Sequence, residues 1–322
     1  MSPRVGLVLG AGGATGSGFH AGVLAALHDA LGFDARTAAV IVGTSAGAAT
    51  GALVRAGLSA ADLAARACGE PLSAHGVRVM RAMGSAPAYV APRPSPPSPR
   101  PSSLAGVIAA GLRPWNARVG TVAAALVGEG TLSTEPMAAL FRQLYGGRWS
   151  AEPLWLCAVR LDDGRRVVFD QAMPGIDVGT AVAASCAVPG WFSPVVINGA
   201  RYVDGGAFSP TNADLLREGG VDALIVSAPM SSTPAATGVR IDAPSRYLHH
   251  SYLLAETAWV RSANMPVLVV EPTRDDLDAF GPNPMDALHR AAVTRAVRSS
   301  VAARLLTGDL QRAAVAIGLS PS

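Results

Sequence analysis

A serine stands between two glycines in Gly43-Thr44-Ser45-Ala46-Gly47, directly after the β-branched run Val40-Ile41-Val42. This spacing fits G-x-S-x-G, in which the glycines permit a sharp strand-to-helix turn that exposes the serine Oγ. The pattern alone is a weak signal, but a strand-forming run precedes it and a helix-forming run follows it. The alternative is an ordinary turn in which the serine caps the helix. Ser45 is therefore a candidate nucleophile.

A glycine-rich loop, residues 10–16, follows an apolar run at residues 5–9. Free N–H groups at the start of a helix favour a negative charge, either a dinucleotide pyrophosphate or the oxyanion of an acyl-transfer intermediate. Read from Gly10, the frame G-x-G-x-x-G places Thr15 where the third glycine belongs. Asp34 lies near the spacing of a ribose-binding acid, so the nucleotide interpretation is weakened and stays open. No G-K-[ST] occurs, which excludes a Walker phosphate loop.

An aspartate follows a predicted hairpin in Tyr202-Val203-Asp204-Gly205-Gly206. The hairpin is predicted over residues 195–203, with Asn198-Gly199 as its two-residue turn. The glycines leave Asp204 approachable, so it is a candidate acid or base. Asp-Gly is also common in turns that have no catalytic role, which is the alternative.

Together these motifs resemble the patatin-like phospholipases. The resemblance covers roughly residues 5–230 and rests on residues 6–16, 43–47, 184–190, 202–206 and 207–212, in that order. It implies a Ser-Asp dyad, with Ser45 as nucleophile and Asp204 as general base. The backbone N–H groups of Gly12, Gly13 and Ala14 would form the oxyanion hole. The supporting glycines would be Gly10, Gly16, Gly43, Gly47, Gly205 and Gly206.

The resemblance also implies the reaction class. Such enzymes hydrolyse lipid acyl esters through an acyl-enzyme, as phospholipases A, lysophospholipases or carboxylesterases, without a catalytic histidine and with no metal or cofactor expected. Two positions depart from the family pattern. Thr15 stands where the family usually carries Arg or Lys, and Ala11 replaces the first glycine of its usual triplet. Loss of the basic residue would weaken the oxyanion hole or remove a contact to an anionic head group.

The physical requirements of this chemistry agree with the resemblance. A serine hydroxyl needs a base within hydrogen-bond reach. An aspartate near its ordinary pKa of about 3.9 is a weak base, so burial must raise that pKa or the oxyanion hole must lower more of the barrier.

Competing assignments remain open on the sequence. Ser45, Asp204 and His249 or His250 follow the chain order of an α/β-hydrolase triad, although the elbow comes earlier than that fold usually places it. A non-catalytic protein, binding either a nucleotide or a lipid, is the other class. His20 lies close to the glycine loop and is expected to pack within a helix.

The elements that must position these residues alternate between strand and helix. Strands are predicted at 5–9, 39–42, 154–160, 166–169, 223–227 and 267–270, with helices near 17–31, 46–56, 245–264 and 284–306. A further helix is predicted after Thr134. This alternation predicts an α/β protein with three α/β/α layers and a mainly parallel central sheet.

We expect one domain over residues 1–322. Residues 71–131 are read as a Pro-rich insertion that forms a cap or lid, and residues 232–322 as a C-terminal extension of the same domain. The segment 91–101 holds six prolines and is expected to be extended. Two short segments near 103–112 and 118–127 flank it. Their apolar residues make them one candidate for lipid contact, and the helix near 286–306 is another if it does not pack on the sheet.

Composition excludes several classes. Half of the 322 residues are hydrophobic and 15% are charged, so a substantial core is expected. The net charge of +3 comes without basic runs, which argues against nucleic-acid binding. The three cysteines, Cys68, Cys157 and Cys186, indicate reduced thiols. Uncharged stretches at 37–54 and 178–200 are read as core, and no secretory signal is recognised. We expect a cytoplasmic protein with peripheral membrane contact.

Overall fold

The apolar runs form one sheet in the computed structural model, which describes residues 3–84, 94–112 and 118–320. Its order is β5-β6-β3-β2-β1-β7-β8, with β4 also paired to β3. Strands β1, β2, β3, β7 and β8 run parallel, while β4, β5 and β6 run antiparallel to their neighbours. The strand bounds are β1 Val5–Leu9, β2 Val40–Thr44, β3 Leu154–Arg160, β4 Arg166–Phe169, β5 Val195–Ile197, β6 Ala200–Asp204, β7 Ala223–Ser227 and β8 Val267–Val270.

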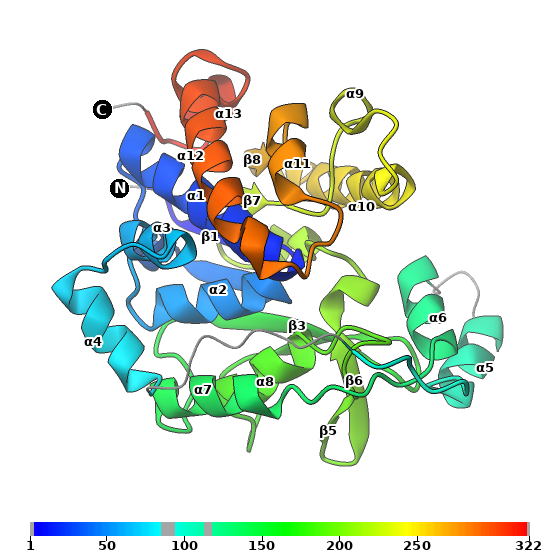
Figure 1. Ribbon diagram of the computed structural model, residues 1–322. Helices are drawn as coiled ribbons and strands as arrows, with labels where there is room; N and C mark the ends of the chain where they lie inside the picture. Colours follow the sequence, from blue (N-terminus) through cyan, green and yellow to red (C-terminus); the bar gives the residue numbers. More distant parts are fainter. Residues whose placement is uncertain (1–2, 85–93, 113–117, 321–322) are drawn as a thin grey trace.

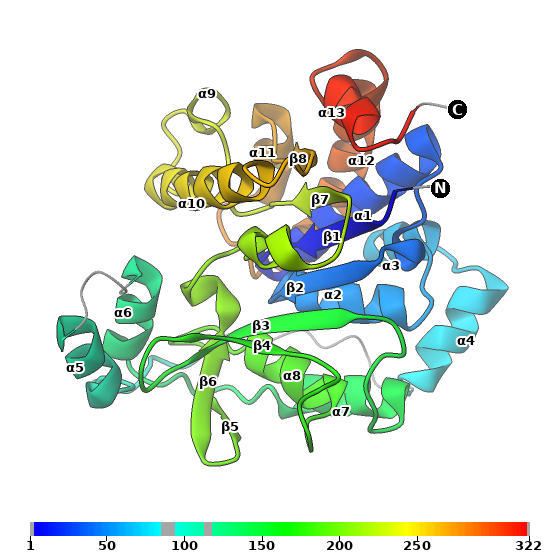
Figure 2. The same cartoon turned by 180° about the vertical axis from the view of Figure 1, so that it is seen from behind.

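Helices cover both faces of this sheet, which confirms the predicted α/β class with three layers (Figures 1 and 2). Every residue of β1, β2 and β7 is buried, as parallel strands between two helical layers require. One face packs on α1 (Gly13–Leu31), α2 (Ala46–Arg55) and α8 (Val178–Ser185). The other packs on α10 (Ala243–Arg261) and the 3₁₀ helix η4 (Ala213–Glu218).

Strand β3 joins the two halves of the candidate site. Its register pairs Cys157 with Thr44 of β2 and the next residue, Ala158, with Asp204 of β6. Because β4 occupies the opposite edge of β3 over Leu156–Val159, β2 and β6 share one edge. The turn after β2 and the end of β6 therefore meet beside consecutive residues of β3.

Helix α12 (Arg290–Thr307), near the C-terminus, packs along α1 over much of its length (Figure 1). Its stripe of apolar residues is almost fully buried: Val293, Val297, Val301 and Leu305. Burial of this stripe removes the alternative of an interfacial helix at this position. The helices α11 (Arg274–Phe280) and α13 (Leu310–Ala316) pack on α12, and α9 (Pro234–Thr237) packs on α11.

The segment predicted to form a cap contains three helices in two places. Helix α4 (Ala74–Ala82) packs against α7 (Glu135–Tyr145), near α3 (Ala60–Cys68) in the views. Helices α5 (Leu104–Leu112) and α6 (Val119–Leu126) pack on each other at the far side, beside β6 (Figures 1 and 2). Residues 94–101 form neither helix nor strand, as predicted. Residues 91–93 of the Pro-rich segment lie outside the described residues.

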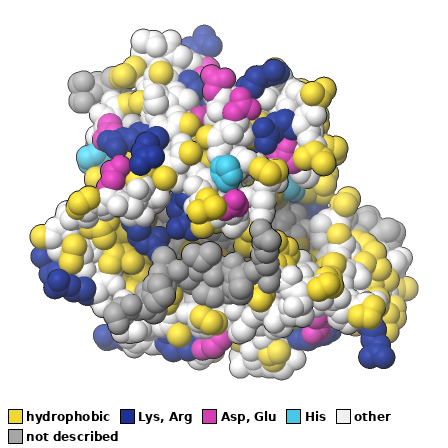
Figure 3. All heavy atoms as spheres, viewed as in Figure 1, with side chains coloured by type: hydrophobic (Ala, Val, Ile, Leu, Met, Phe, Trp, Pro, Cys, Tyr) yellow, Lys and Arg dark blue, Asp and Glu magenta, His cyan; other side chains and the backbone are white. Residues whose placement is uncertain are grey.

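Apolar side chains are exposed on α5 and α6. Leu104, Ile108 and Leu112 of α5 are 68%, 61% and 72% exposed, and Val119 and Leu126 of α6 are also exposed. Figure 3 shows hydrophobic side chains gathered over this end of the molecule. Within the described ranges, no helix is both long enough and apolar enough to cross a bilayer.

Candidate active site

Ser45 sits at a strained corner between β2 and α2. Its φ of 55° and ψ of −117° lie in a region that side chains other than glycine rarely adopt, at a cost of about 1–3 kcal/mol. Both flanking glycines allow close backbone approach. A Cβ on Gly43 would lie 2.6 Å from Ala48 Cα, and one on Gly47 would lie 1.9 Å from the carbonyl oxygen of Leu9. Ser45 occupies the N-cap position of α2, but its side chain makes no capping hydrogen bond, so the hydroxyl is not used to cap the helix.

The end of α8 holds the backbone of Ser45. The Ser45 N–H donates to Ser185 Oγ at 2.9 Å, and the Ser185 hydroxyl donates in turn to the Cys157 carbonyl at 2.6 Å. The Cys186 thiol donates to the Ser45 carbonyl at 3.3 Å. Burial raises the pKa of that thiol, with a further contribution from Asp204, so it stays protonated. The sequence showed residues 184–190 as a motif but did not assign Ser185 or Cys186 a place at the elbow.

Asp204 is the last residue of β6 and is buried beside Ser45. Both residues are only 5% exposed. The Asp204 N–H donates to the Ala187 carbonyl at 2.9 Å, and its Oδ1 accepts the Gly206 N–H at 2.7 Å. Burial raises the pKa of Asp204 to about 6, while hydrogen bonding to the Ser45 side chain and to the Gly206 N–H acts in the opposite direction. Gly205 begins the short 3₁₀ helix that follows. The carboxyl group is thus a stronger base than an exposed aspartate.

The glycine loop leaves three N–H groups without an acceptor among the described residues, those of Gly12, Gly13 and Ala14. The groups on either side are bonded: Gly10 N–H to Ser227 O, Ala11 N–H to Pro210 O, Thr15 N–H to Pro284 O and Gly16 N–H to Gly12 O. Gly13 and Ala14 open α1, so the positive end of that helix adds to their donor strength.

A cavity of about 180 Å³ brings Ser45 together with Gly13 and Ala14. Its walls are largely apolar and include Leu53, Leu63, Met83, Met137, Leu140, Phe141, Val188 and Phe192. Neither Gly12 nor Asp204 lines this cavity; Asp204 is buried next to Ser45. The site thus offers a hydroxyl, a neighbouring base and free N–H donors, which is the constellation that acyl transfer needs.

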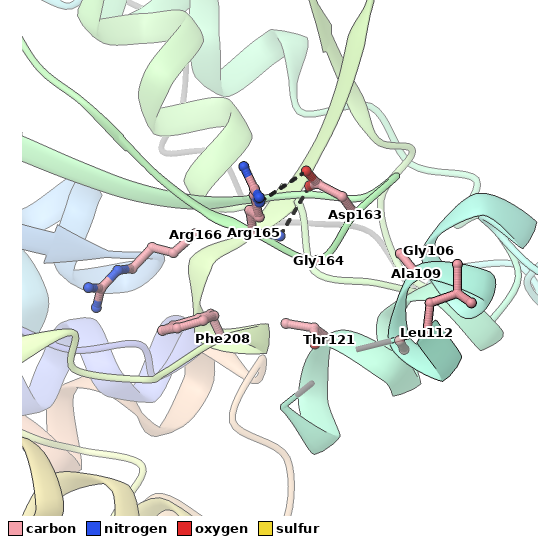
Figure 4. A pocket seen from close by; sticks show the side chains of 10 residues that line it. Gly106, Ala109, Leu112, Thr121, Asp163, Gly164, Arg165, Arg166 and Phe208 are labelled. Atoms are coloured by element: carbon pink, nitrogen blue, oxygen red, sulfur yellow. Dashed lines mark hydrogen bonds and ion pairs between the residues drawn. The ribbon is translucent and has the colours of Figure 1, made fainter. Parts of the chain in front are cut away.

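A larger cavity, of about 660 Å³, lies away from the dyad. Figure 4 shows it between α5 and α6 on one side and the turn between β3 and β4 on the other. Arg165 N–H donates to Asp163 Oδ1 at 3.2 Å there, and Arg166 binds Asp214 at 2.6 Å. Since neither Ser45 nor Asp204 lines it, this cavity is separate from the candidate site.

The histidines take structural positions. His20 is fully buried, with Nε2 2.7 Å from the Gly10 carbonyl and Nδ1 2.8 Å from Ser227 Oγ. A carbonyl only accepts, so Nε2 carries the proton and the serine hydroxyl donates to Nδ1. Burial lowers the pKa of His20 to about 4, and the ring braces the glycine loop as a neutral group.

The residues required by the Ser-Asp-His triad and by the nucleotide-binding interpretation bind elsewhere in the structure. His249 Nδ1 lies 3.4 Å from the Met230 carbonyl and His250 Nδ1 lies 2.8 Å from Glu271, so neither contacts Ser45 or Asp204. Asp34, which the nucleotide interpretation requires, binds Arg36 and caps a 3₁₀ helix. Among the described residues no group of three or more His, Cys, Asp or Glu side chains could hold a metal ion.

Comparison with known proteins connects the Asp204 half of the site to a family. The model described as Patatin-like phospholipase matches residues 150–217, which include β3, Ser185 and Asp204. No curated protein sequence matches the chain significantly.

Similar solved structures include VipD from Legionella pneumophila, at 13% identity and a TM-score of 0.41, over 93% of this chain and 66% of that chain. The type III effector protein ExoU is 19% identical, with a TM-score of 0.36, over 97% and 53%. Human GIVD cytosolic phospholipase A2, in complex with a methyl gamma-linolenyl fluorophosphonate inhibitor and terbium chloride, is 13% identical, with a TM-score of 0.37, over 98% and 60%. This chain therefore spans between about half and two thirds of their lengths. The family match confirms the resemblance to the patatin-like phospholipases over residues 150–217, the segment that carries Asp204.

Proposed function

We propose that this protein is a serine acylhydrolase of lipid esters, with Ser45 as nucleophile and Asp204 as general base. The family match supports lipid ester hydrolysis in general. One observation carries the specific assignment: the Ser45 side chain lies close enough to the buried Asp204 carboxyl group to act on its pKa, which burial raises to about 6. The free N–H groups of Gly13 and Ala14 line the same cavity as Ser45 and supply the oxyanion hole, with Gly12 beside them.

The reaction proceeds in two halves. Ser45 Oγ attacks the ester carbonyl carbon while Asp204 accepts the hydroxyl proton, and the carbonyl oxygen becomes an oxyanion bound by the loop N–H groups. The tetrahedral intermediate then collapses, and the alcohol leaves with the proton from Asp204. In the second half a water molecule attacks the acyl-enzyme and gives its proton to Asp204. Collapse of that intermediate releases the carboxylic acid and returns the proton to Ser45.

The surroundings of Ser45 and Asp204 suit the roles of nucleophile and general base. A carboxylate with a pKa near 6 is ionised at neutral pH, yet it is a stronger base than an exposed aspartate. Loss of one oxyanion donor costs about 3–4 kcal/mol in comparable enzymes, so the loop is expected to matter as much as the base. The apolar cavity walls fit an acyl chain, and the small volume fits the reacting ester and part of one chain.

The exposed apolar faces of α5 and α6 support contact with a lipid surface. Neither helix contains a charged residue over its bounds, and Leu104 and Ile108 of α5 are exposed. An apolar helix face of this kind gains free energy by inserting at the boundary between head groups and acyl chains. We infer that the protein binds peripherally to its lipid substrate through these helices.

The test compares Ser45→Ala and Asp204→Ala with the wild-type protein. Both variants are expected to lose hydrolysis of a short p-nitrophenyl ester, and Ser45→Ala should also lose labelling by a fluorophosphonate. His249→Ala and His250→Ala serve as matched controls and should stay active, with or without a chelator. Turnover retained in either dyad variant contradicts the mechanism. An unlabelled, inactive wild-type protein with the correct fold indicates a lipid-binding protein instead.

A further inference from the structure

Two arginines line the cavity that contains Ser45. Arg66 comes from α3 and Arg290 is the first residue of α12, so the cations reach the site from distant parts of the chain. The Arg290 Nε donates to the Ala14 carbonyl at 3.4 Å, which ties this arginine to the oxyanion loop. Within the described part of the chain, the Arg66 guanidinium is influenced by burial and by Arg290, with no acidic partner.

No carboxylate compensates these two charges within the described residues. Other arginines near the surface are paired; Arg142, for example, binds Glu135 and Asp177. The acids closest along the chain bind elsewhere, since Glu70 faces Arg295 and Asp286 faces His289. The segments outside the described ranges, residues 1–2, 85–93, 113–117 and 321–322, contain no Asp or Glu. Within the ranges that the structure describes, no acidic side chain acts on either arginine.

This arrangement is electrostatically unfavourable without a ligand. Burial lowers the pKa of both Arg66 and Arg290, and Arg290 lowers that of Arg66 further through repulsion. Two like charges in an apolar cavity destabilise the protein unless an anion compensates them. Guanidinium groups present paired N–H donors that match the oxygens of phosphate and carboxylate.

Thr15 of the glycine loop contributes no charge to the cavity. Its side chain is fully buried, and its hydroxyl donates toward the Pro284 carbonyl at 3.3 Å and the Gly12 carbonyl at 3.4 Å. Thr15 does not line the cavity, whereas Met285 and Arg290, just beyond Pro284, do. The segment that holds the glycine loop from behind thus also delivers a cation to the site.

We propose that Arg66 and Arg290 form an anion-binding subsite beside Ser45, which selects esters carrying a phosphate or carboxylate close to the reacting bond. The selection of substrates rests on the proposed function, whereas the binding of an anion rests on the cavity alone. The phosphate or carboxylate of the substrate binds to the two guanidinium groups. The transient oxyanion occupies the loop N–H groups, so the two negative charges have separate sites.

Hydrolysis of two esters with the same acyl chain tests the selectivity. Decanoyl lysophosphatidate carries a phosphate, and monodecanoylglycerol carries none. We expect wild type to prefer the phosphate ester, and the Arg66→Gln/Arg290→Gln variant to lose that preference by about tenfold or more in the ratio of kcat/KM values, largely through KM. Arg66→Lys/Arg290→Lys should restore part of it. Arg295→Gln, an exposed arginine on α12, is the matched control and should leave the ratio unchanged.

Binding provides an arm that does not depend on turnover. Calorimetry with decyl phosphate should detect binding to wild type and a loss of about tenfold or more in affinity in the double Gln variant. Displacement by inorganic phosphate would identify the anion alone as the ligand, and no displacement would identify an anionic amphiphile. Equal affinity in both proteins, or an unchanged ester preference, overturns the proposal. If wild type hydrolyses neither ester, the proposed function fails and the binding result alone decides the subsite.

Stability separates this role from a structural one. If the two arginines only supported the fold, their replacement by Gln would lower the melting temperature. Relief of uncompensated charge instead predicts an unchanged or higher melting temperature without ligand, together with a smaller upward shift on adding decyl phosphate. A lower melting temperature with an unchanged ligand shift contradicts the subsite.

Discussion

Replacing Asp204 with Asn should abolish activity and stabilise the protein at the same time. Asn has almost the same shape as Asp, and its Oδ1 can still accept the Gly206 N–H that now lies at 2.7 Å. The substitution therefore removes the ionisable group while leaving the packing around it. Without a base, the Ser45 hydroxyl cannot be deprotonated during attack, so ester hydrolysis should fall to background.

The size of the stabilisation follows from the pKa of the carboxyl group. Burial raises that pKa from 3.8 to about 6, a difference of 2.2, which corresponds to about 3 kcal/mol at about 1.36 kcal/mol per unit. The folded state holds the proton more tightly than the unfolded state, so this group's contribution to stability falls as pH rises from about 4 to about 6. Above pH 6 the full penalty remains.

Urea unfolding of both proteins across pH measures this difference directly. At pH 7 the Asn variant should be more stable by up to about 3 kcal/mol, and the difference should vanish below about pH 4, where Asp204 is protonated in both states. Subtracting the two curves removes the contributions of all other titrating groups. Asp278→Asn, at a side chain that is 75% exposed, is the control and should change stability little at any pH.

A stability difference that does not depend on pH would refute the reasoning, because only a titrating group produces the predicted step. A destabilised Asn variant at pH 7 would also refute it. That result would mean that the ionised carboxylate is favourably solvated in the folded protein. The base strength inferred for Asp204 would then be wrong, and the oxyanion hole would have to lower more of the barrier.

Three other predictions concern the site and its surroundings. The pH profile of kcat/KM should rise with a midpoint near 6, because Asp204 must be ionised to accept a proton; a flat profile from pH 4 to 8 argues against this base. Gly47→Ala should abolish activity, since its Cβ would collide with the Leu9 carbonyl next to the glycine loop, whereas Gly111→Ala, in open space on α5, should stay active in the same ester assay. Leu104→Ser should lower cosedimentation with phosphatidylcholine vesicles while leaving p-nitrophenyl ester hydrolysis intact; unchanged cosedimentation contradicts lipid contact through α5.

Local sequence patterns were sufficient to predict most strands and the turns that carry the candidate site residues. The predicted strands at 154–160, 166–169, 223–227 and 267–270 coincide with β3, β4, β7 and β8, because buried strands consist of short apolar runs with clear ends. The Asn198-Gly199 turn forms as predicted, with both residues at positive φ. Helix α1 begins at Gly13 rather than near residue 17, since the glycine loop itself supplies the first turn of the helix.

Contacts between residues that are distant in the sequence could not be predicted from local patterns. Nothing local to Ser185 indicates that its hydroxyl accepts the Ser45 N–H, because that contact depends on how α8 meets β2 and β3. The presence of Arg66 and Arg290 in one cavity depends likewise on the packing of α3 and α12 against α1. Helix α8 itself lay inside an uncharged stretch with no helical periodicity to distinguish it. Tertiary packing therefore decides which polar residues become part of the site.

The attachment of both halves of the dyad to one strand has a consequence for how this architecture tolerates change. Thr44 and Asp204 pair with consecutive residues of β3, so one residue's rise, about 3.3 Å, sets their offset along the sheet. The length of chain that connects them does not enter that offset. Insertions and deletions in the region of α4, α5 and α6 can therefore accumulate without moving the hydroxyl relative to the carboxylate, which leaves lipid contact free to diversify while the chemistry stays constant.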